Sequence, residues 1–173
     1  MCKCKYTDDK LHHECGVFGI YGVEDAAGLA YYGLHALQHR GQQGCGIVSV
    51  GPDGEFHRVK GDGLVTEVFN GDKIAKLPGK MAIGHVRYSN AGCKGTENLQ
   101  PFLFHHNSGD FALANNGQIV NYHQLRDELE DRGSLFQSSS DAEILAHLIK
   151  KQGTDKEQPR INSLREALNV IDG

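Results

Sequence analysis

Short apolar runs bounded by glycine recur over the first two thirds of the chain, and they predict β-strands. The first run follows a polar stretch at residues 1–14. Two of the runs are separated by Gly51-Pro52-Asp53-Gly54, in which proline and glycine favour a tight turn. The predicted strands are 15–22, 44–50, 56–60, 80–88, 101–106 and 110–114, the last two as a hairpin.

Apolar positions with helical spacing predict one helix early in the chain and three helices at its end. Asp25 is the predicted N-cap of a helix over 25–40 that Gly41 ends. Residues 64–69 predict one short helical turn. The predicted N-terminal caps of the late helices are Asn121, the pair Ser140 and Glu143, and the pair Ser163 and Glu166, each pair with capping-box spacing.

This order of elements predicts an α+β fold of antiparallel sheets covered by outer helices, because short turns join antiparallel strands. An apolar share of 39% and a charged share of 23% are typical of a folded domain and argue against disorder. The net charge of −4 argues against nucleic-acid binding. No apolar run reaches about 18 residues, so we expect no membrane span.

The cysteines indicate a reducing compartment. Their number is odd, and residues 1–14 lack the apolar segment of a secretory signal, so we expect free thiols and a cytoplasmic location. The five are Cys2, Cys4, Cys15, Cys45 and Cys93.

Cys15 is the candidate nucleophile because it opens the first apolar strand directly after the polar leader. A buried structural cysteine in this place is the alternative. If residues 1–14 were removed, Cys15 would carry a free α-amine with a pKa of about 7.7–8.0. One residue would then supply both a nucleophile and its base.

Asn115-Asn116-Gly117 is a turn sequence, and it could also bind an oxyanion. The Asn116 amide and the Gly117 N–H can point the same way, which is the arrangement that stabilises the charge of a tetrahedral intermediate.

Three charged residues are candidate substrate anchors. Arg40 and Arg87 are either solvated surface charges or residues whose planar guanidinium binds a carboxylate through two hydrogen bonds. Asp141, at the start of a predicted helix, either interacts with the helix dipole or binds an ammonium group. An arginine and an aspartate together could hold the backbone end of an amino acid.

With these candidate nucleophile, oxyanion and anchor residues together, the sequence resembles the class II glutamine amidotransferases, which use an N-terminal nucleophile. No single motif is specific, but seven occur in order between residue 15 and about residue 150. The matching segments are Cys15-Gly-Val-Phe-Gly-Ile20, Gln38-His-Arg-Gly-Gln42, Gly63-Leu-Val-Thr-Glu-Val-Phe69, Gly84-His-Val-Arg-Tyr88, Gln100-Pro-Phe102, Asn116-Gly117 and Ser139-Ser-Asp141.

The resemblance implies a four-layer αββα sandwich of two antiparallel sheets, with Cys15 attacking the glutamine side-chain amide to give a thioester and ammonia. It implies an oxyanion hole at Asn116 and Gly117. Arg87 would bind the substrate α-carboxylate, Asp141 its α-amine, and Arg40 would support the nucleophile region. We expect residues 1–14 to be a leader and residues 15–173 a glutaminase domain that lacks its C-terminal part.

Within the family, the sequence is most similar to the purine-synthesis members, which pass ammonia to phosphoribosyl pyrophosphate. The resemblance implies a phosphoribosyltransferase domain outside this chain and a homo-oligomer at full length. We expect no cofactor in this part, and Mg²⁺ with an iron–sulphur cluster in some full-length relatives. The partners expected are glutamine and phosphoribosyl pyrophosphate, with no nucleic acid and no membrane.

The sequence departs from the family at three positions, where Asn90, Asn115 and Gln118 replace the usual threonine, histidine and asparagine. A hexosamine-forming aminotransferase is the nearest alternative, but His39 and Tyr88 match the purine branch.

An alternative from a different class is a small zinc module, since cysteine and histidine side chains are zinc ligands. Its ligands would come from Cys2, Cys4, His12, His13 and Cys15.

Overall fold

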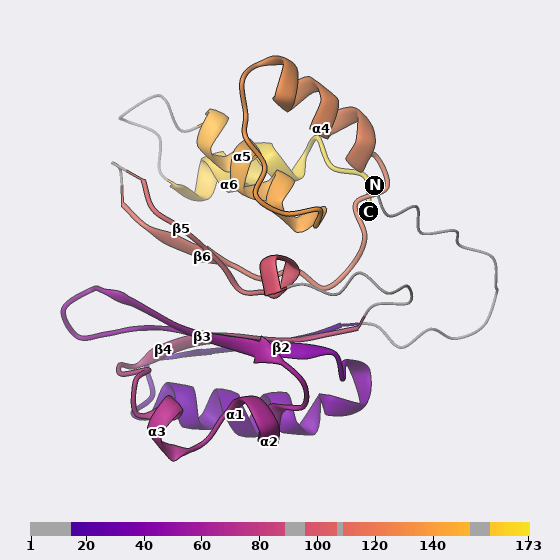
Figure 1. Ribbon diagram of the computed structural model, residues 1–173. Coiled ribbons are helices and arrows are strands. Elements are labelled where there is room, and N and C mark those ends of the chain that lie inside the picture. The colour runs from indigo at the N-terminus through magenta and orange to yellow at the C-terminus, as the bar shows by residue number, and fades with distance from the viewer. Residues whose placement is uncertain (1–14, 89–95, 107–108, 153–159) are drawn as a thin grey trace. The chain divides into compact units, whose positions relative to one another are not determined.

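The computed structural model describes residues 15–88, 96–106, 109–152 and 160–173. The chain divides into two compact units, and the boundary along the sequence lies between Asn116 and Gly117. The first unit is built on a four-stranded antiparallel sheet in the order β1-β4-β2-β3 (Figure 1). Gly16 lies opposite Val86, and Gly44 lies opposite Arg87. The strands are β1 (Gly16–Tyr21), β2 (Gly44–Val50), β3 (Phe56–Asp62) and β4 (Met81–Arg87).

Helices cover one face of this sheet (Figure 1), and the main hydrophobic core lies between these helices and the strands. The longest, α1 (Ala26–Ala36), lies close to the strands because it turns small side chains toward them. At Gly33 an added Cβ would come 2.6 Å from the Phe18 ring, so only glycine fits there. Two short helices, α2 (Val65–Val68) and α3 (Gly71–Ile74), complete this layer.

The segment from the 3₁₀ turn η2 (Thr96–Asn98) to Pro101 lies against the opposite face of the sheet. The two-stranded sheet of β5 (Phe102–Phe104) and β6 (Phe111–Leu113) follows this segment in the chain. Contact is close at Gly46, where an added Cβ would lie 2.5 Å from the Gln100 carbonyl oxygen. Lys60 Nζ donates to the carbonyls of Thr96 and Leu99, which joins η2 to β3.

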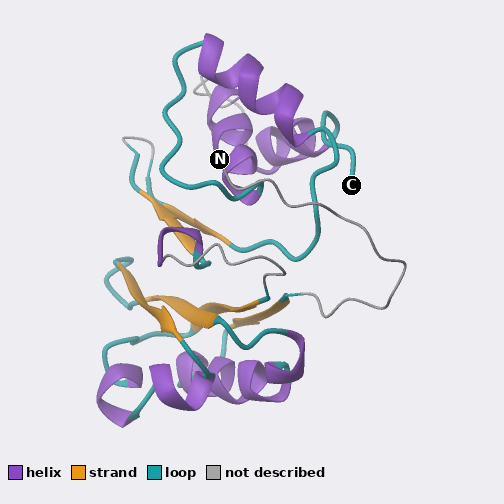
Figure 2. Ribbon diagram, turned by 45° about the vertical axis from the view of Figure 1, so that its right-hand side comes forward, coloured by secondary structure: helices purple, strands orange, loops and turns teal. Residues whose placement is uncertain are grey.

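The second unit, Gly117–Gly173, is helical, as Figure 2 shows in purple. It contains α4 (Tyr122–Asp131), α5 (Ala142–Gln152) and α6 (Arg160–Leu168). Leu125 and Leu129 are buried on α4, as are Ile144 and Leu148 on α5. Among the described residues, no helix is both long and apolar enough to cross a membrane.

The predicted strands and hairpin are confirmed, with small changes at their ends. The predicted helix over 25–40 is too long, because α1 ends at Ala36 and a 3₁₀ turn, η1 (Gln38–Arg40), follows. The Gln38 side chain stabilises this turn by donating to Gly41 O and accepting from Val65 N–H. The sequence pattern did not predict α3.

Of the predicted caps, only Asp25 is confirmed, since its side chain accepts from Gly28 N–H. Asn121 does not cap α4, because its side-chain amide donates to Val170 O and accepts from Asp172 N–H. The Ser140 and Glu143 box is wrong as well, because Glu143 accepts from Gln137 and Ser138.

The Ser163 and Glu166 box is also wrong. The helix α6 begins at Arg160, so Ser163 lies inside it rather than at its start.

Candidate active site

The predicted nucleophile lies directly before β1, at one end of the four-stranded sheet. Cys15 is half-buried, and its Sγ receives a hydrogen bond from Tyr88 N–H at 3.4 Å. The sulfur also lies 3.7 Å from Tyr88 O, to which the thiol donates. An N–H donor favours the negatively charged sulfur. The end of β4 thus orients the thiol of Cys15.

Arg40 contacts the backbone of the nucleophile. Its Nε donates to Cys15 O at 3.1 Å, from the 3₁₀ turn that Gln38 stabilises. A guanidinium fixed in this way restrains Cys15 at its carbonyl oxygen. The contact is consistent with the supporting role that the resemblance implies for Arg40, a role that stays a prediction, and it assigns no substrate to this residue.

Arg87 is the last residue of β4 and lies opposite Gly44 of β2. On the other side of β4 lies β1, in which Gly16 pairs with Val86. The antiparallel register therefore brings Cys15, which precedes Gly16, opposite Arg87. The guanidinium of Arg87 and the thiol of Cys15 therefore come from one end of the sheet. This arrangement suits a substrate whose carboxylate and amide carbonyl lie a few bonds apart.

The turn at Asn115 is held by a residue to which the sequence assigned no role. Gln100 is buried, and its Oε1 accepts from Asn115 N–H at 2.7 Å. Asn116 follows and is exposed, while Gly117 has φ +148°, a conformation that favours glycine. The motif Gln100-Pro101-Phe102 was visible in the sequence, but its partner fifteen residues later was not.

Asp141 belongs to the helical unit and lies immediately before α5. Its Oδ1 accepts from Ala142 N–H at 2.9 Å, and its Oδ2 accepts from Ile119 N–H at 2.8 Å. Each oxygen keeps a lone pair for a further donor. The Asp141 carboxylate is thus fixed to the N–H of Ile119, which follows Gly117 by two residues, and it can still bind an ammonium group.

The structure brings Cys15, Arg40 and Arg87 together in the first unit, which also contains Asn116. Gly117 and Asp141 are in the second unit. Asn90 lies outside the described residues, as do Cys2, Cys4, His12 and His13 of the alternative zinc module. In the part of the chain that is described, no three His, Cys, Asp or Glu residues are placed to hold a metal ion.

Comparison with known proteins decides the family. A family profile described as a glutamine amidotransferase domain matches residues 72–163. An amidophosphoribosyltransferase of Lacticaseibacillus casei is 49% identical over 164 residues, which cover 94% of this chain and 82% of that relative. The chain belongs to the glutamine amidotransferase family.

Further similarities connect this glutamine amidotransferase domain with the purine branch. It is 53% identical to the amidophosphoribosyltransferase of Bacillus subtilis (strain 168), over 94% of this chain and 34% of that protein. A solved structure of "the allosteric regulatory enzyme of purine biosynthesis" matches with a TM-score of 0.85 and 50% identity, over 91% of this chain and 33% of that one. This match confirms the α+β class with two antiparallel sheets. The chain spans about a third of the length of these two proteins.

Cys45 is the other cysteine that the structure describes in this amidotransferase domain, and it is unsuited to nucleophilic attack. It is fully buried in β2, on the face covered by α1. Burial raises the pKa of its thiol to about 12, and the smaller lowering effect of Lys73 does not offset it. Cys45 therefore remains a neutral core residue at physiological pH.

A pocket of about 390 Å³ lies near the other end of the sheet and is separate from the nucleophile. It is lined by Val50 and Met81, which are opposite each other, whereas Cys15 lies beside Arg87 at the far end of β4. The pocket therefore plays no part in the amidotransferase site described above.

His85 is a buried residue of this amidotransferase that the sequence did not single out. It lies on β4 two residues before Arg87 and is 1% exposed. Neither ring nitrogen has a hydrogen-bond partner of normal geometry, although the Asn115 backbone is close enough to favour the protonated form slightly. Burial dominates and lowers the pKa of His85 to about 4.

We expect His85 to make stability depend on pH between 4 and 6.5. In this window the unfolded histidine binds a proton and the folded one does not, so the free energy of unfolding rises with pH. The contribution is complete above about pH 6.5, and about 3 kcal/mol is lost as the pH falls to 4. Urea unfolding of His85→Asn should show a flatter dependence in this window. His123→Asn, at an exposed position of α4, should keep the original slope.

Proposed function

We propose that this domain hydrolyses glutamine to glutamate and ammonia, with Cys15 as an N-terminal nucleophile exposed by removal of residues 1–14. The observation that carries the proposal is the hydrogen-bonded Cys15 sulfur beside the end of β4, where Arg87 also lies. Family membership adds the amide of glutamine as the bond to be cleaved.

In the proposed reaction the α-amine of Cys15 takes the thiol proton while Sγ attacks the side-chain carbonyl carbon of glutamine. The Asn116 amide and the Gly117 N–H donate to the oxyanion of the tetrahedral intermediate. The C–N bond then breaks, and the proton held by the α-amine goes to the departing nitrogen, giving ammonia and a thioester. Water attacks the thioester and releases glutamate and the free thiol.

Arg87 and Asp141 would select an amino acid as the substrate. The planar fork of Arg87 suits two oxygens of the α-carboxylate, while the Asp141 carboxylate suits the α-ammonium. Arg40 would act on the nucleophile through its contact with Cys15 O. Binding both backbone charges at once would fix the side-chain amide within reach of the thiol.

We further propose that the ammonia serves the synthesis of phosphoribosylamine from phosphoribosyl pyrophosphate, in a cytoplasmic homo-oligomer. The relatives from Bacillus subtilis and Lacticaseibacillus casei are both amidophosphoribosyltransferases, which supports the assignment of phosphoribosylamine as the product. Mg²⁺ would accompany the pyrophosphate on the transferase part of the protein. Glutamine hydrolysis as proposed here needs no cofactor, because Cys15 supplies both the nucleophile and its base.

A diazo- or chloroketone analogue of glutamine should test the nucleophile directly. We expect it to alkylate Cys15 in the protein at its native length, and glutamine should protect that residue. Cys45 is an internal control, because its buried thiol should stay unlabelled. Peptide mapping also shows whether the labelled peptide begins at Cys15. An adduct on another cysteine, or a labelled protein that retains residues 1–14, would contradict the proposal.

A further inference from the structure

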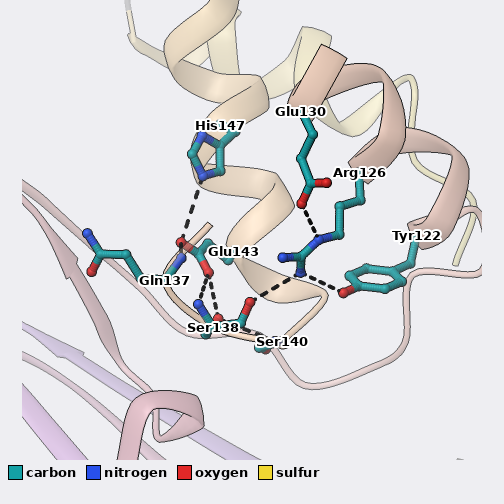
Figure 3. Close-up of polar contacts among 8 residues, drawn as sticks. All are labelled: Tyr122, Arg126, Glu130, Gln137, Ser138, Ser140, Glu143 and His147. Carbon is teal, nitrogen blue, oxygen red and sulfur yellow. Dashed lines mark hydrogen bonds and ion pairs between the residues drawn. The ribbon is translucent and has the colours of Figure 1, made fainter. Parts of the chain in front are cut away.

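The loop that precedes α5, residues 137–141, is held by a buried carboxylate outside the proposed chemistry. Glu143 is 2% exposed and accepts from Gln137 N–H at 2.9 Å, Ser138 N–H at 2.8 Å and Ser138 Oγ at 2.6 Å (Figure 3). His147 Nε2 lies 3.8 Å from the Glu143 carboxylate, beyond normal hydrogen-bond distance. Three donors from one loop therefore converge on a single side chain.

The Glu143 carboxylate is stabilised in its charged form. Burial by itself would raise the pKa of Glu143, but His147 and the donors of Gln137 and Ser138 outweigh burial and lower the pKa to about 2. Hydrogen bonds to a charged acceptor are stronger than neutral ones. The loop is consequently fixed to the first turn of α5 by charge-assisted bonds.

A second contact fixes the same loop from α4. Arg126 Nη1 donates to Ser138 O at 3.2 Å and to the Tyr122 hydroxyl at 2.8 Å, while its Nε donates to Glu130 at 2.7 Å (Figure 3). The guanidinium carbon lies 4.3 Å from the centre of the Phe136 ring. Ser138 is therefore bonded on both its N–H and its carbonyl side.

The loop ends at Asp141, two residues before Glu143. The Asp141 carboxylate has little freedom, because Ile119 N–H and Ala142 N–H each donate to one of its oxygens. Its position depends on where the backbone of the loop enters α5, and the bonds to Glu143 set that point of entry.

We propose that Glu143 is a positioning residue for substrate recognition: by holding the loop 137–141 it places Asp141 to bind the α-ammonium of glutamine. This inference rests on the proposed function, and it adds the residue on which selectivity for an amino acid depends. Glu143 contacts no reacting atom and acts only through Asp141.

Glu143→Gln is the informative substitution because it keeps the shape of the side chain and changes its bonding. An amide has one acceptor oxygen, and its NH₂ group would face a donor of Gln137 or Ser138. At least one loop bond is lost, and a buried donor is left unsatisfied. Ser138→Ala is the milder variant, since it removes the hydroxyl donor alone.

The readout is selectivity between glutamine and glutaramate, which carries the same amide but no α-amine. Each variant is made in the protein at its native length, and kcat/KM is measured for both compounds. We divide kcat/KM for glutamine by kcat/KM for glutaramate, and we expect Glu143→Gln to lower this ratio roughly tenfold. A higher KM for glutamine should cause this change, with glutaramate hydrolysis little affected. Ser138→Ala should lower the ratio less, by roughly threefold.

Two controls set the scale. Glu128→Gln, the same substitution on the exposed face of α4, should leave the ratio unchanged. Asp141→Asn should lower the ratio at least as much as Glu143→Gln, because it removes the charge that binds the ammonium. An unchanged ratio in Asp141→Asn would contradict the role of Asp141 in the proposed function, and the positioning role with it.

The inference can fail by itself. If Asp141→Asn lowers the ratio but Glu143→Gln and Ser138→Ala both keep it, Glu143 does not position Asp141. An equal loss of activity toward glutamine and glutaramate in Glu143→Gln would also overturn the inference. Such a loss would indicate general destabilisation, which lowers both activities alike, rather than weaker binding of the α-ammonium. If Glu143→Gln does not fold, the ratio in Ser138→Ala decides.

Discussion

Replacing Cys15 by serine is expected to reduce glutamine hydrolysis below detection. A serine hydroxyl is far less acidic than a thiol, so an α-amine near neutrality is too weak a base to activate it. The tetrahedral and thioester intermediates then have no efficient route of formation. The measurement is glutamate release by the variant at its native length, compared with the unsubstituted protein.

The same Cys15→Ser variant should retain phosphoribosylamine synthesis from free ammonia, which bypasses the amide-cleaving step. That activity shows that the protein is folded and that only the glutamine half has been lost. Normal use of glutamine by the variant would exclude Cys15 as the nucleophile.

Asn116→Ala is expected to have the second largest effect, a decrease of roughly 10²–10³ in kcat. The substitution removes one of the two proposed oxyanion donors and leaves the Gly117 N–H. Because the donor acts mainly in the transition state, KM for glutamine should change little. Steady-state kinetics of glutamate release separates the two parameters.

Asn115→Ala is the matched comparison for this result. The structure assigns the contact at Asn115 to its backbone N–H, which donates to Gln100 Oε1 and survives the substitution. We therefore expect a much smaller loss of kcat than in Asn116→Ala. Equal losses in the two variants would show that the turn matters as a whole and that the Asn116 amide has no particular role.

The strands and the residues at their ends could be predicted because their signals are local. Glycine-bounded apolar runs indicated β1 to β4, and Cys15 and Arg87 lie at the ends of such runs. The pairing that brings these two residues together joins β1 to β4, which are separated in the chain by α1, β2 and β3, so it could not be predicted from local signals.

Two of the wrong caps have one cause, which is that the side chain bonds to partners other than its own first helical turn. Glu143 had the spacing of a capping box, yet its carboxylate bonds to Gln137 and Ser138 because the loop folds back over α5. Asn121 could have capped α4, but its amide bonds to residues 49 and 51 positions later. Local spacing describes what a side chain can reach within one turn and contains no information on such contacts.

The contacts of Cys15 do not depend on whether residues 1–14 are still attached. Arg40 binds the carbonyl oxygen of Cys15, and the Tyr88 backbone binds the sulfur. Neither contact involves the peptide bond between Glu14 and Cys15, so cutting that bond leaves both in place. If residues 1–14 are removed as proposed, the sulfur is already oriented before the cut. Activation would then add one basic group, the α-amine of Cys15, and would not rebuild the catalytic centre.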